Sequence, residues 1–230
     1  MFVSLSSLFL IGLVFGSFIS AVSYRLPRNI DFVKGRSFCD NCKKNLFWYD
    51  NIPLVSYIVF WGKSRCCGKK ISSRYPVIEI ATAIGFSVLY LFSFSPIYYL
   101  VYLISLTIFI IDYEFQIIPD ELSWCILFLA IFFSPYPLFQ SIFAGLIFSF
   151  AILLLNIITR GRGMGLGDVK LTLGLGAWLG LEKGLTWLTA SFIIGGIVAT
   201  LLLLFNKKSM NSKIAFGPFL IMAFWLILFL

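Results

Sequence analysis

Two aspartates in strongly apolar surroundings are the residues of this sequence best suited to chemistry. Asp112 ends one apolar run, and Asp168 follows the glycine-rich stretch 163–167 at the start of another. An aspartate at the centre of a membrane helix costs about 2.5–3.5 kcal/mol on insertion scales, so an acid there indicates a function. Two carboxylates that share a proton can activate a water and hydrogen-bond a carbonyl oxygen. We interpret them as the catalytic pair of an intramembrane aspartic protease; the alternative is that each only caps a helix.

The composition indicates a membrane protein and excludes several kinds of active site. Of the 230 residues, 60% are hydrophobic and 12% are charged, against about 25% charged in an average soluble domain. Histidine is absent, which excludes Ser-His-Asp triads, Cys-His dyads and the H-E-x-x-H zinc site. Hydrolysis would therefore depend on carboxylates or on a Ser-Lys pair.

The apolar segments that position these acids predict an all-α polytopic integral membrane protein with about eight transmembrane helices. The segments are 2–24, 77–94, 97–111, 122–134, 138–158, 170–181, 185–205 and 214–230. Several are short for the ~20 residues of a spanning helix, which leaves room for tilted or broken helices beside the aspartates. The predicted parts are a first transmembrane helix (1–24), a cytoplasmic loop domain with cysteines (25–76) and a transmembrane protease core (77–230).

Small residues predict where these helices pack closely, because they let backbones approach one another. Predicted helix contacts are Gly12, Gly16, Ser17 and Ser20 on one face, and Gly174, Gly176, Gly195 and Gly196 further along the chain. Cys125, within an apolar segment, is expected to be a small buried hydrophobe.

The distribution of basic residues predicts the orientation. Eleven of the eighteen Lys and Arg residues lie in the loop 25–76. If this loop is cytoplasmic and there are eight spans, every other basic residue except Lys183 falls on the same side. The same count puts Asp112 and Asp168 together near the cytoplasmic surface. Topology therefore accounts for the net charge of +8, and we expect no nucleic-acid partner.

The loop cysteines predict a metal or redox site. Cys39 and Cys42 form a C-x-x-C pair, and the adjacent Cys66 and Cys67 follow later. Two C-x-x-C pairs would indicate zinc, but Ser64 stands where the second pair needs its first thiolate. Cytoplasmic placement argues against structural disulfides. Zinc bound by the four cysteines is one hypothesis; free thiols or a redox pair is the other.

Taken together and in order, the motifs resemble those of the bacterial type IV prepilin peptidases, which are bifunctional leader peptidase/N-methyltransferases of the GxGD aspartic protease type. The matching set covers nearly the whole chain: Gly16-Ser17-Phe18, Tyr24-Arg25-Leu26-Pro27, the first cysteine pair, Trp48-Tyr49-Asp50-Asn51-Ile52-Pro53, Ile71-Ser72, Arg74-Tyr75-Pro76, Glu79, Asp112 before Pro119-Asp120, the stretch 163–170 and Phe216-Gly217-Pro218. Asp120, after a proline, is expected to be the N-cap of the next helix.

The resemblance implies a reaction and a set of site residues. Asp112 and Asp168 would be catalytic, and the residues shaping their site would be Gly165, Gly167, Lys170 and Pro119. The enzyme would lie in the bacterial cytoplasmic (inner) membrane. It would cut type IV prepilins or pseudopilins at the cytoplasmic face, after the glycine that ends a short basic leader and before an apolar helix. It would then methylate the new N-terminus with S-adenosylmethionine.

The resemblance also assigns methyl transfer to the loop 25–76. The candidates for binding S-adenosylmethionine, in this loop and directly after it, are Trp48, Asp50, Arg74 and Glu79. Two departures from the family pattern, Ser20 in place of the usual asparagine and Ser64, bear on methyl transfer and zinc but not on the aspartates.

Three rival interpretations explain less of the sequence. The stretch Gly165-Leu166-Gly167-Asp168 also resembles the presenilin and signal-peptide-peptidase motif, but those families lack the cysteine loop. Outside enzymes, intramembrane acids are typical of proton- or cation-coupled transporters, which predicts acids near the bilayer midplane and repeated halves. The charge distribution instead places both aspartates near one surface, and no repeat is evident. A structural scaffold would leave the aspartate pair unexplained.

Overall fold

The computed structural model has no β-strand in its described part and divides into two compact units, Met1–Leu103 and Ile104–Leu230. The structure describes residues 4–31, 37–39, 41–161, 163–205 and 214–230. Two groups of residues used in the sequence analysis lie outside these ranges. They are the beginning of the first predicted span (residues 2 and 3) and the basic residues Lys34, Arg36, Arg162, Lys207, Lys208 and Lys213.

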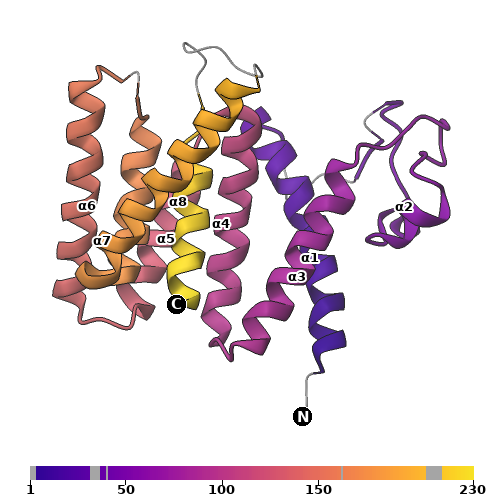
Figure 1. The fold of residues 1–230 in the computed structure, drawn as a ribbon. Coiled ribbons are helices and arrows are strands. Elements are labelled where there is room, and N and C mark those ends of the chain that lie inside the picture. The colour runs from indigo at the N-terminus through magenta and orange to yellow at the C-terminus, as the bar shows by residue number, and fades with distance from the viewer. Residues whose placement is uncertain (1–3, 32–36, 40, 162, 206–213) are drawn as a thin grey trace. The chain divides into compact units, whose positions relative to one another are not determined.

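The first unit contains two long helices and a polar loop between them (Figure 1). Its elements are α1 (Leu5–Arg25), the 3-10 turns η1 (Leu26–Arg28) and η2 (Trp48–Asn51), α2 (Val55–Val59), α3 (Arg74–Leu91) and the beginning of α4 (Pro96–Phe115). Helices α1 and α3 touch at glycines: a Cβ at Gly12 would lie 2.6 Å from Ala83 Cα, and one at Gly16 2.6 Å from Glu79 Cα. The predicted close contact at these two glycines is confirmed.

The second unit contains the rest of α4 and four further helices, with α7 packed against α5, α6 and α8. The helices are α5 (Asp120–Phe133), α6 (Leu138–Ile158), α7 (Leu166–Leu204) and α8 (Gly217–Phe229). A Cβ at Gly174 would lie 3.0 Å from Ile126 of α5, and one at Gly176 3.1 Å from Phe148 of α6, as expected for helix contacts. Cys125 is exposed on α5, so the prediction that it is buried is wrong.

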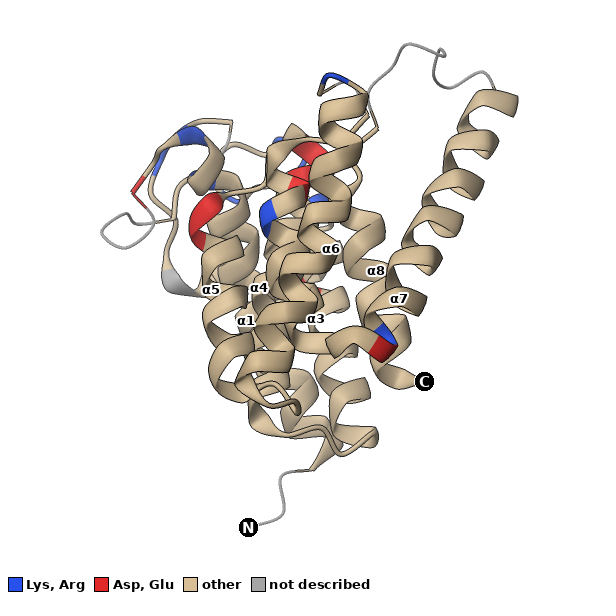
Figure 2. Cartoon of the chain, turned by 90° about the vertical axis from the view of Figure 1, so that its left-hand side faces the viewer, with Lys and Arg blue, Asp and Glu red and all other residues tan. Residues whose placement is uncertain are grey.

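Helix α7 is broken at Gly180, where φ is 69° and ψ is −175°. The two halves correspond to the predicted segments 170–181 and 185–205. Only glycine adopts this conformation at little cost, and a Cβ there would also lie 2.9 Å from the ring of Tyr136. The second half carries Glu182 and Lys183 just after the break, and residues 184–204 that follow carry no charged side chain (Figure 2).

Length and composition make this a multi-pass membrane protein. Five described helical segments are long and apolar enough to cross a bilayer: Leu5–Arg28, Arg74–Leu91, Pro96–Phe115, Leu138–Ile158 and Leu166–Leu204. Helix α8 is apolar but shorter, and so is α5, with 14 residues. Large apolar side chains are exposed along the long helices, as for Val14 at 62% and Ile193 at 61%. Such surfaces suit lipid, because hydrocarbon replaces the water that they would otherwise contact.

Candidate active site

Asp112 lies in the last turn of α4 and is only 4% exposed. The helix ends after Phe115 because Gln116 adopts a φ of 56°; its N–H donates to the carbonyl of Asp112 at 2.9 Å. The backbone amide of Gly217 is directed at the carboxylate. Oδ2, however, is buried and has no hydrogen-bond partner among the described residues. Burying an acceptor without a partner is costly, so this oxygen is suited to meet a proton, a water or a substrate.

Asp168 is the third residue of α7 and is 7% exposed. Its Oδ2 accepts the N–H of Gly165, the residue before the helix, at 2.9 Å. One oxygen therefore stabilises the helix start, as the capping alternative expects. Oδ1 is also buried, and no hydrogen-bond partner for it exists among the described residues. Helix capping thus accounts for only one of the two carboxylate oxygens of Asp168.

Two glycines near the aspartates, Gly217 and Gly167, have no room for a Cβ. A Cβ at Gly217 would lie 2.6 Å from Asp112 Oδ2, and a Cβ at Gly167 would lie 2.9 Å from Ile118 Cβ. The Cδ1 atom of Ile118 is also 3.1 Å from the Cβ position at Gly217, so Ile118 fills the space beside both glycines. At Gly165 the nearest atom is 3.7 Å away, an ordinary contact.

A cavity of about 1300 Å³ in the second unit is lined by both aspartates. Their carboxylates are close enough to interact electrostatically. The aromatic residues Phe192, Phe216 and Phe219 make up part of its apolar lining. The predicted pair is therefore brought to one cavity from two helices that are far apart in sequence.

The ion pair between Asp120 and Lys170 also lines this cavity, with Oδ2 and Nζ 2.6 Å apart. It connects the first turn of α5 to the first turn of α7. The buried Pro119 occupies the N-cap position of α5, and Asp120 is the first helical residue. The predicted N-cap role of Asp120 is therefore wrong. Pro119 is not part of the cavity lining and acts on the site only through the start of α5.

The four loop cysteines of the first unit come together in one cluster, with their sulfurs all within 4.8 Å of one another. They lie on two turns with the same backbone hydrogen bonds. In the first, the Cys39 N–H donates to Lys44 and the Lys43 N–H donates to Cys39. In the second, the Ser64 N–H donates to Lys69 and the Gly68 N–H donates to Ser64. Ser64 is thus the structural counterpart of Cys39.

Ser64 contacts two of the sulfurs: its Oγ lies 3.3 Å from Cys39 Sγ and 3.1 Å from Cys66 Sγ. Burial opposes ionisation of Cys39, but hydrogen bonds from Ser64 and from the amides of Cys42 and Asn41 lower its pKa to about 6. Ser64 also lowers the pKa of Cys66, yet the neighbouring sulfurs of Cys42 and Cys39 outweigh it and raise that pKa to about 12. The cluster therefore holds one readily ionised thiol.

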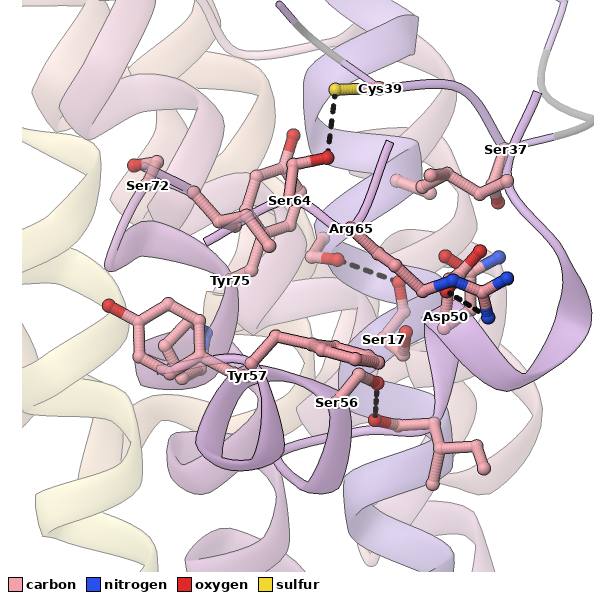
Figure 3. Close-up of a pocket in the computed structure, with 18 of the residues that line it drawn as sticks. Ser17, Ser37, Cys39, Asp50, Ser56, Tyr57, Ser64, Arg65, Ser72 and Tyr75 are labelled. Carbon is pink, nitrogen blue, oxygen red and sulfur yellow. Dashed lines mark hydrogen bonds and ion pairs between the residues drawn. The ribbon is translucent and has the colours of Figure 1, made fainter. Parts of the chain in front are cut away.

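A second cavity, of about 320 Å³, lies in the first unit next to this cluster (Figure 3). The carboxylates of Asp50 and Glu79 line it. Glu79 is 7% exposed and accepts the Leu54 N–H at 2.8 Å. Asp50 Oδ1 is buried without a hydrogen-bond partner among the described residues, and its nearest cation is Arg65 NH1 at 3.8 Å. Figure 3 shows Asp50 and Arg65 together, with Cys39 and Ser64 at another side of the cavity.

Of the other predicted cofactor candidates, Arg74 does not line this cavity. Its guanidinium donates to Ser20 O at 3.0 Å and to Ser23 Oγ at 2.8 Å, which ties α3 to α1. The side chain of Trp48 lies outside what the structure describes. Arg65 was not predicted as a site residue; its guanidinium also stacks over the Tyr49 ring, 4.7 Å from the ring centroid. No motif in the sequence near Arg65 indicates a role in this cavity.

Gly217 and Ile118 were also missed as site residues. The motif containing Gly217 was visible, but its closeness to Asp112 depends on the folded chain. The contact of Ile118 with Gly167 depends on it in the same way.

Known proteins match both parts of the chain. Residues 10–93 match the family described as bacterial peptidase A24 N-terminal domain, and residues 99–200 match the type IV leader peptidase family. A prepilin leader peptidase/N-methyltransferase of Klebsiella pneumoniae is 35% identical over 77% of this chain and 86% of its own. The Pseudomonas aeruginosa protein of that name is 31% identical over 95% of this chain and 88% of its own. The Vibrio cholerae protein of that name is 29% identical over 96% of this chain and 94% of its own. No solved structure gave a significant match. Identity and coverage of this extent establish that the chain belongs to the type IV leader peptidase family.

Proposed function

We propose that Asp112 and Asp168 are the catalytic pair of an endopeptidase that removes the leader of type IV prepilins or pseudopilins, after the glycine that ends the leader. The observation that carries this proposal is the pair of unpartnered oxygens, Asp112 Oδ2 and Asp168 Oδ1, buried in the second unit. Both aspartates line one cavity. The names of the related proteins supply the substrate class.

The pair suits hydrolysis because two neighbouring carboxylates cannot both remain ionised. The ionised one takes a proton from a water, whose oxygen attacks the carbon of the scissile carbonyl. The protonated one hydrogen-bonds the carbonyl oxygen, where negative charge develops. When the C–N bond breaks, the leaving nitrogen takes a proton from the pair, and both carboxylates return to their starting state.

The second proposed activity is methylation of the new N-terminus at the smaller cavity. S-adenosylmethionine, when bound, supplies a methyl group carried on a cationic sulfonium. Asp50 and Glu79 offer negative charge to the cationic groups of that donor, and the Oδ1 of Asp50, which accepts no hydrogen bond from the described residues, would accept one from the donor. Lys63 and Lys70, which also line the cavity, suit the donor's carboxylate.

The cysteine cluster is proposed to hold zinc and so to fix the loop beside this cavity. Four sulfur donors fit tetrahedral zinc, in which each Zn–S bond is about 2.3 Å long. The sulfurs are already close, with Cys39 and Cys67 3.8 Å apart and Cys42 and Cys66 3.0 Å apart. A metal bound by cysteines of both turns would hold the turns together.

The proposed location is the bacterial inner membrane, with the aspartates near the cytoplasmic face. The concentration of basic residues in the loop 25–76 supports this orientation. A site at that surface would let the substrate keep its apolar helix in the membrane while the scissile bond meets water.

The deciding experiment is cleavage of a prepilin by membranes that carry wild type, Asp112→Asn or Asp168→Asn. Each variant keeps the shape of the side chain and removes its charge, so both should leave the precursor uncut at wild-type expression. Glu121→Gln, at an exposed acid of α5, is the matched control and should cut normally. If both aspartate variants cut, the catalytic assignment is refuted. Mass spectrometry of the wild-type product should show one added methyl group.

A further inference from the structure

The second half of α7 presents an unusual face to the larger cavity. Phe192, Gly195, Gly196 and Ala199 line it, and their spacing of i, i+3, i+4 and i+7 places them on one side of the helix. The Phe192 ring is 5.2 Å from that of Phe216, and a Cβ at Gly195 would lie 3.2 Å from Phe219. One edge of this face is therefore packed against the start of α8.

The other edge of the face is open. Apart from its own helix, none of the described residues has an atom within 4 Å of the Cβ position at Gly196, although this position faces a cavity and not only the outer surface. Small residues at such spacing allow the backbones of two membrane helices to approach closely. The glycine pair was predicted to be a helix contact, yet within the described part of the chain Gly195 has such a neighbour and Gly196 does not. The Gly196 side has room for a helix from another molecule.

The chemistry of the face indicates what that helix is. Residues 184–204 carry no charge, so an apolar occupant suits this part of the cavity (Figure 2). The same cavity reaches Asp112 and Asp168, so an occupant on this face is continuous with the candidate catalytic pair. A substrate in which an apolar helix directly follows the scissile bond would fill both places at once.

We propose that the α7 face formed by Phe192, Gly195, Gly196 and Ala199 receives the apolar helix that follows the cleavage site of the substrate. The assignment rests on the proposed function, since it takes the aspartates as the place where the peptide bond is cut. Close packing against the glycines fixes the position of the substrate helix along α7, and this position determines which peptide bond reaches the carboxylates.

The first test enlarges the face. Ala199→Leu places extra carbon atoms where the substrate helix would lie, and kcat/KM for a full-length prepilin should fall about 10-fold, as overpacking of a close contact predicts. Ile197→Phe is the matched control: it adds the same number of carbon atoms on the opposite side of the helix, where Ile197 is 56% exposed. This control should stay within about twofold of wild type, as surface changes usually do. Equal losses in both variants would overturn the proposal.

The second test does not depend on cleavage. A photo-crosslinking residue is placed at position 199 or 197 of the full chain that also carries Asp112→Asn, in membranes with prepilin. Position 199 should attach to the apolar helix of the precursor, and position 197 should not. Attachment of position 199 only to lipid, or to a second copy of this chain, would overturn the docking proposal while leaving the aspartate assignment intact. Conversely, precursor attachment in a variant that still cuts would support docking and refute the catalytic assignment.

Discussion

Substituting Gly217 by alanine tests whether the position of the Asp112 carboxylate controls the reaction. The new Cβ would lie 2.6 Å from Asp112 Oδ2, whereas an ordinary contact begins near 3.4 Å. The carboxylate would therefore have to move by about 0.8 Å. Since a displacement of about 1 Å at a reacting group can cost about 100-fold in rate, we expect kcat/KM for prepilin cleavage to fall by roughly that factor.

The neighbouring glycines supply a graded comparison. Gly167→Ala brings its Cβ to 2.9 Å from Ile118 and should cause an intermediate loss, because Ile118 and not a carboxylate must shift. At Gly165 the nearest atom is 3.7 Å away, so alanine fits without moving Asp168. We expect that variant to cut within about threefold of wild type, since its main cost is a poorer N-cap of up to about 1 kcal/mol.

The assay is the initial rate of cleavage of a purified prepilin in detergent, for wild type and the three alanine variants. Size-exclusion profiles of each variant control for misfolding. A Gly217→Ala enzyme that cuts as fast as wild type, or a Gly165→Ala enzyme that is the slowest of the three, would refute the argument that steric displacement of the carboxylate matters.

Three further predictions concern the rest of the site. Asp120→Asn or Lys170→Met should slow cleavage by no more than about fivefold, since an exposed ion pair is worth up to about 1 kcal/mol; a much larger loss would mean that the side chain touches the substrate. Ser64→Cys should retain more zinc than wild type against a chelator, as measured by metal analysis of purified protein, because it restores a thiolate at the position equivalent to Cys39; unchanged retention would contradict the matching of the two turns. Glu79→Gln should leave cleavage intact but lower the methylated fraction of the product in mass spectra, and loss of cleavage as well would argue against separate sites.

The sequence predicted features that depend on local pattern. Apolar runs located the helices, and small residues located the contact of α1 with α3 at Gly12 and Gly16. The break in α7 was anticipated as a gap between two spans, because Glu182 and Lys183 interrupt the apolar pattern. Its physical cause is Gly180, whose backbone conformation no hydrophobicity pattern reports.

The features that the sequence did not predict depend on contacts between distant parts of the chain. Asp120 was expected to cap α5, but Pro119 holds that position and the carboxylate pairs with Lys170 of another helix. The grouping of the four loop cysteines was predicted, and the structure brings their sulfurs together, but the contacts of Ser64 with Cys39 and Cys66 inside the cluster were not. Both the ion pair of Asp120 and the contacts of Ser64 follow from tertiary packing, which local sequence patterns do not report.

The hydrogen bond between Gly165 and Asp168 links the stability of the helix start to the chemistry proposed for this carboxylate. The side chain that would handle the proton also secures the first turn of its own helix, so a change in its charge alters both. Replacing Asp168 by alanine would remove the acceptor and loosen the helix start, whereas asparagine keeps an oxygen that can accept the same N–H. Loss of this carboxylate would therefore weaken both the helix start and the proposed activity, so selection for folding and selection for activity would both retain it.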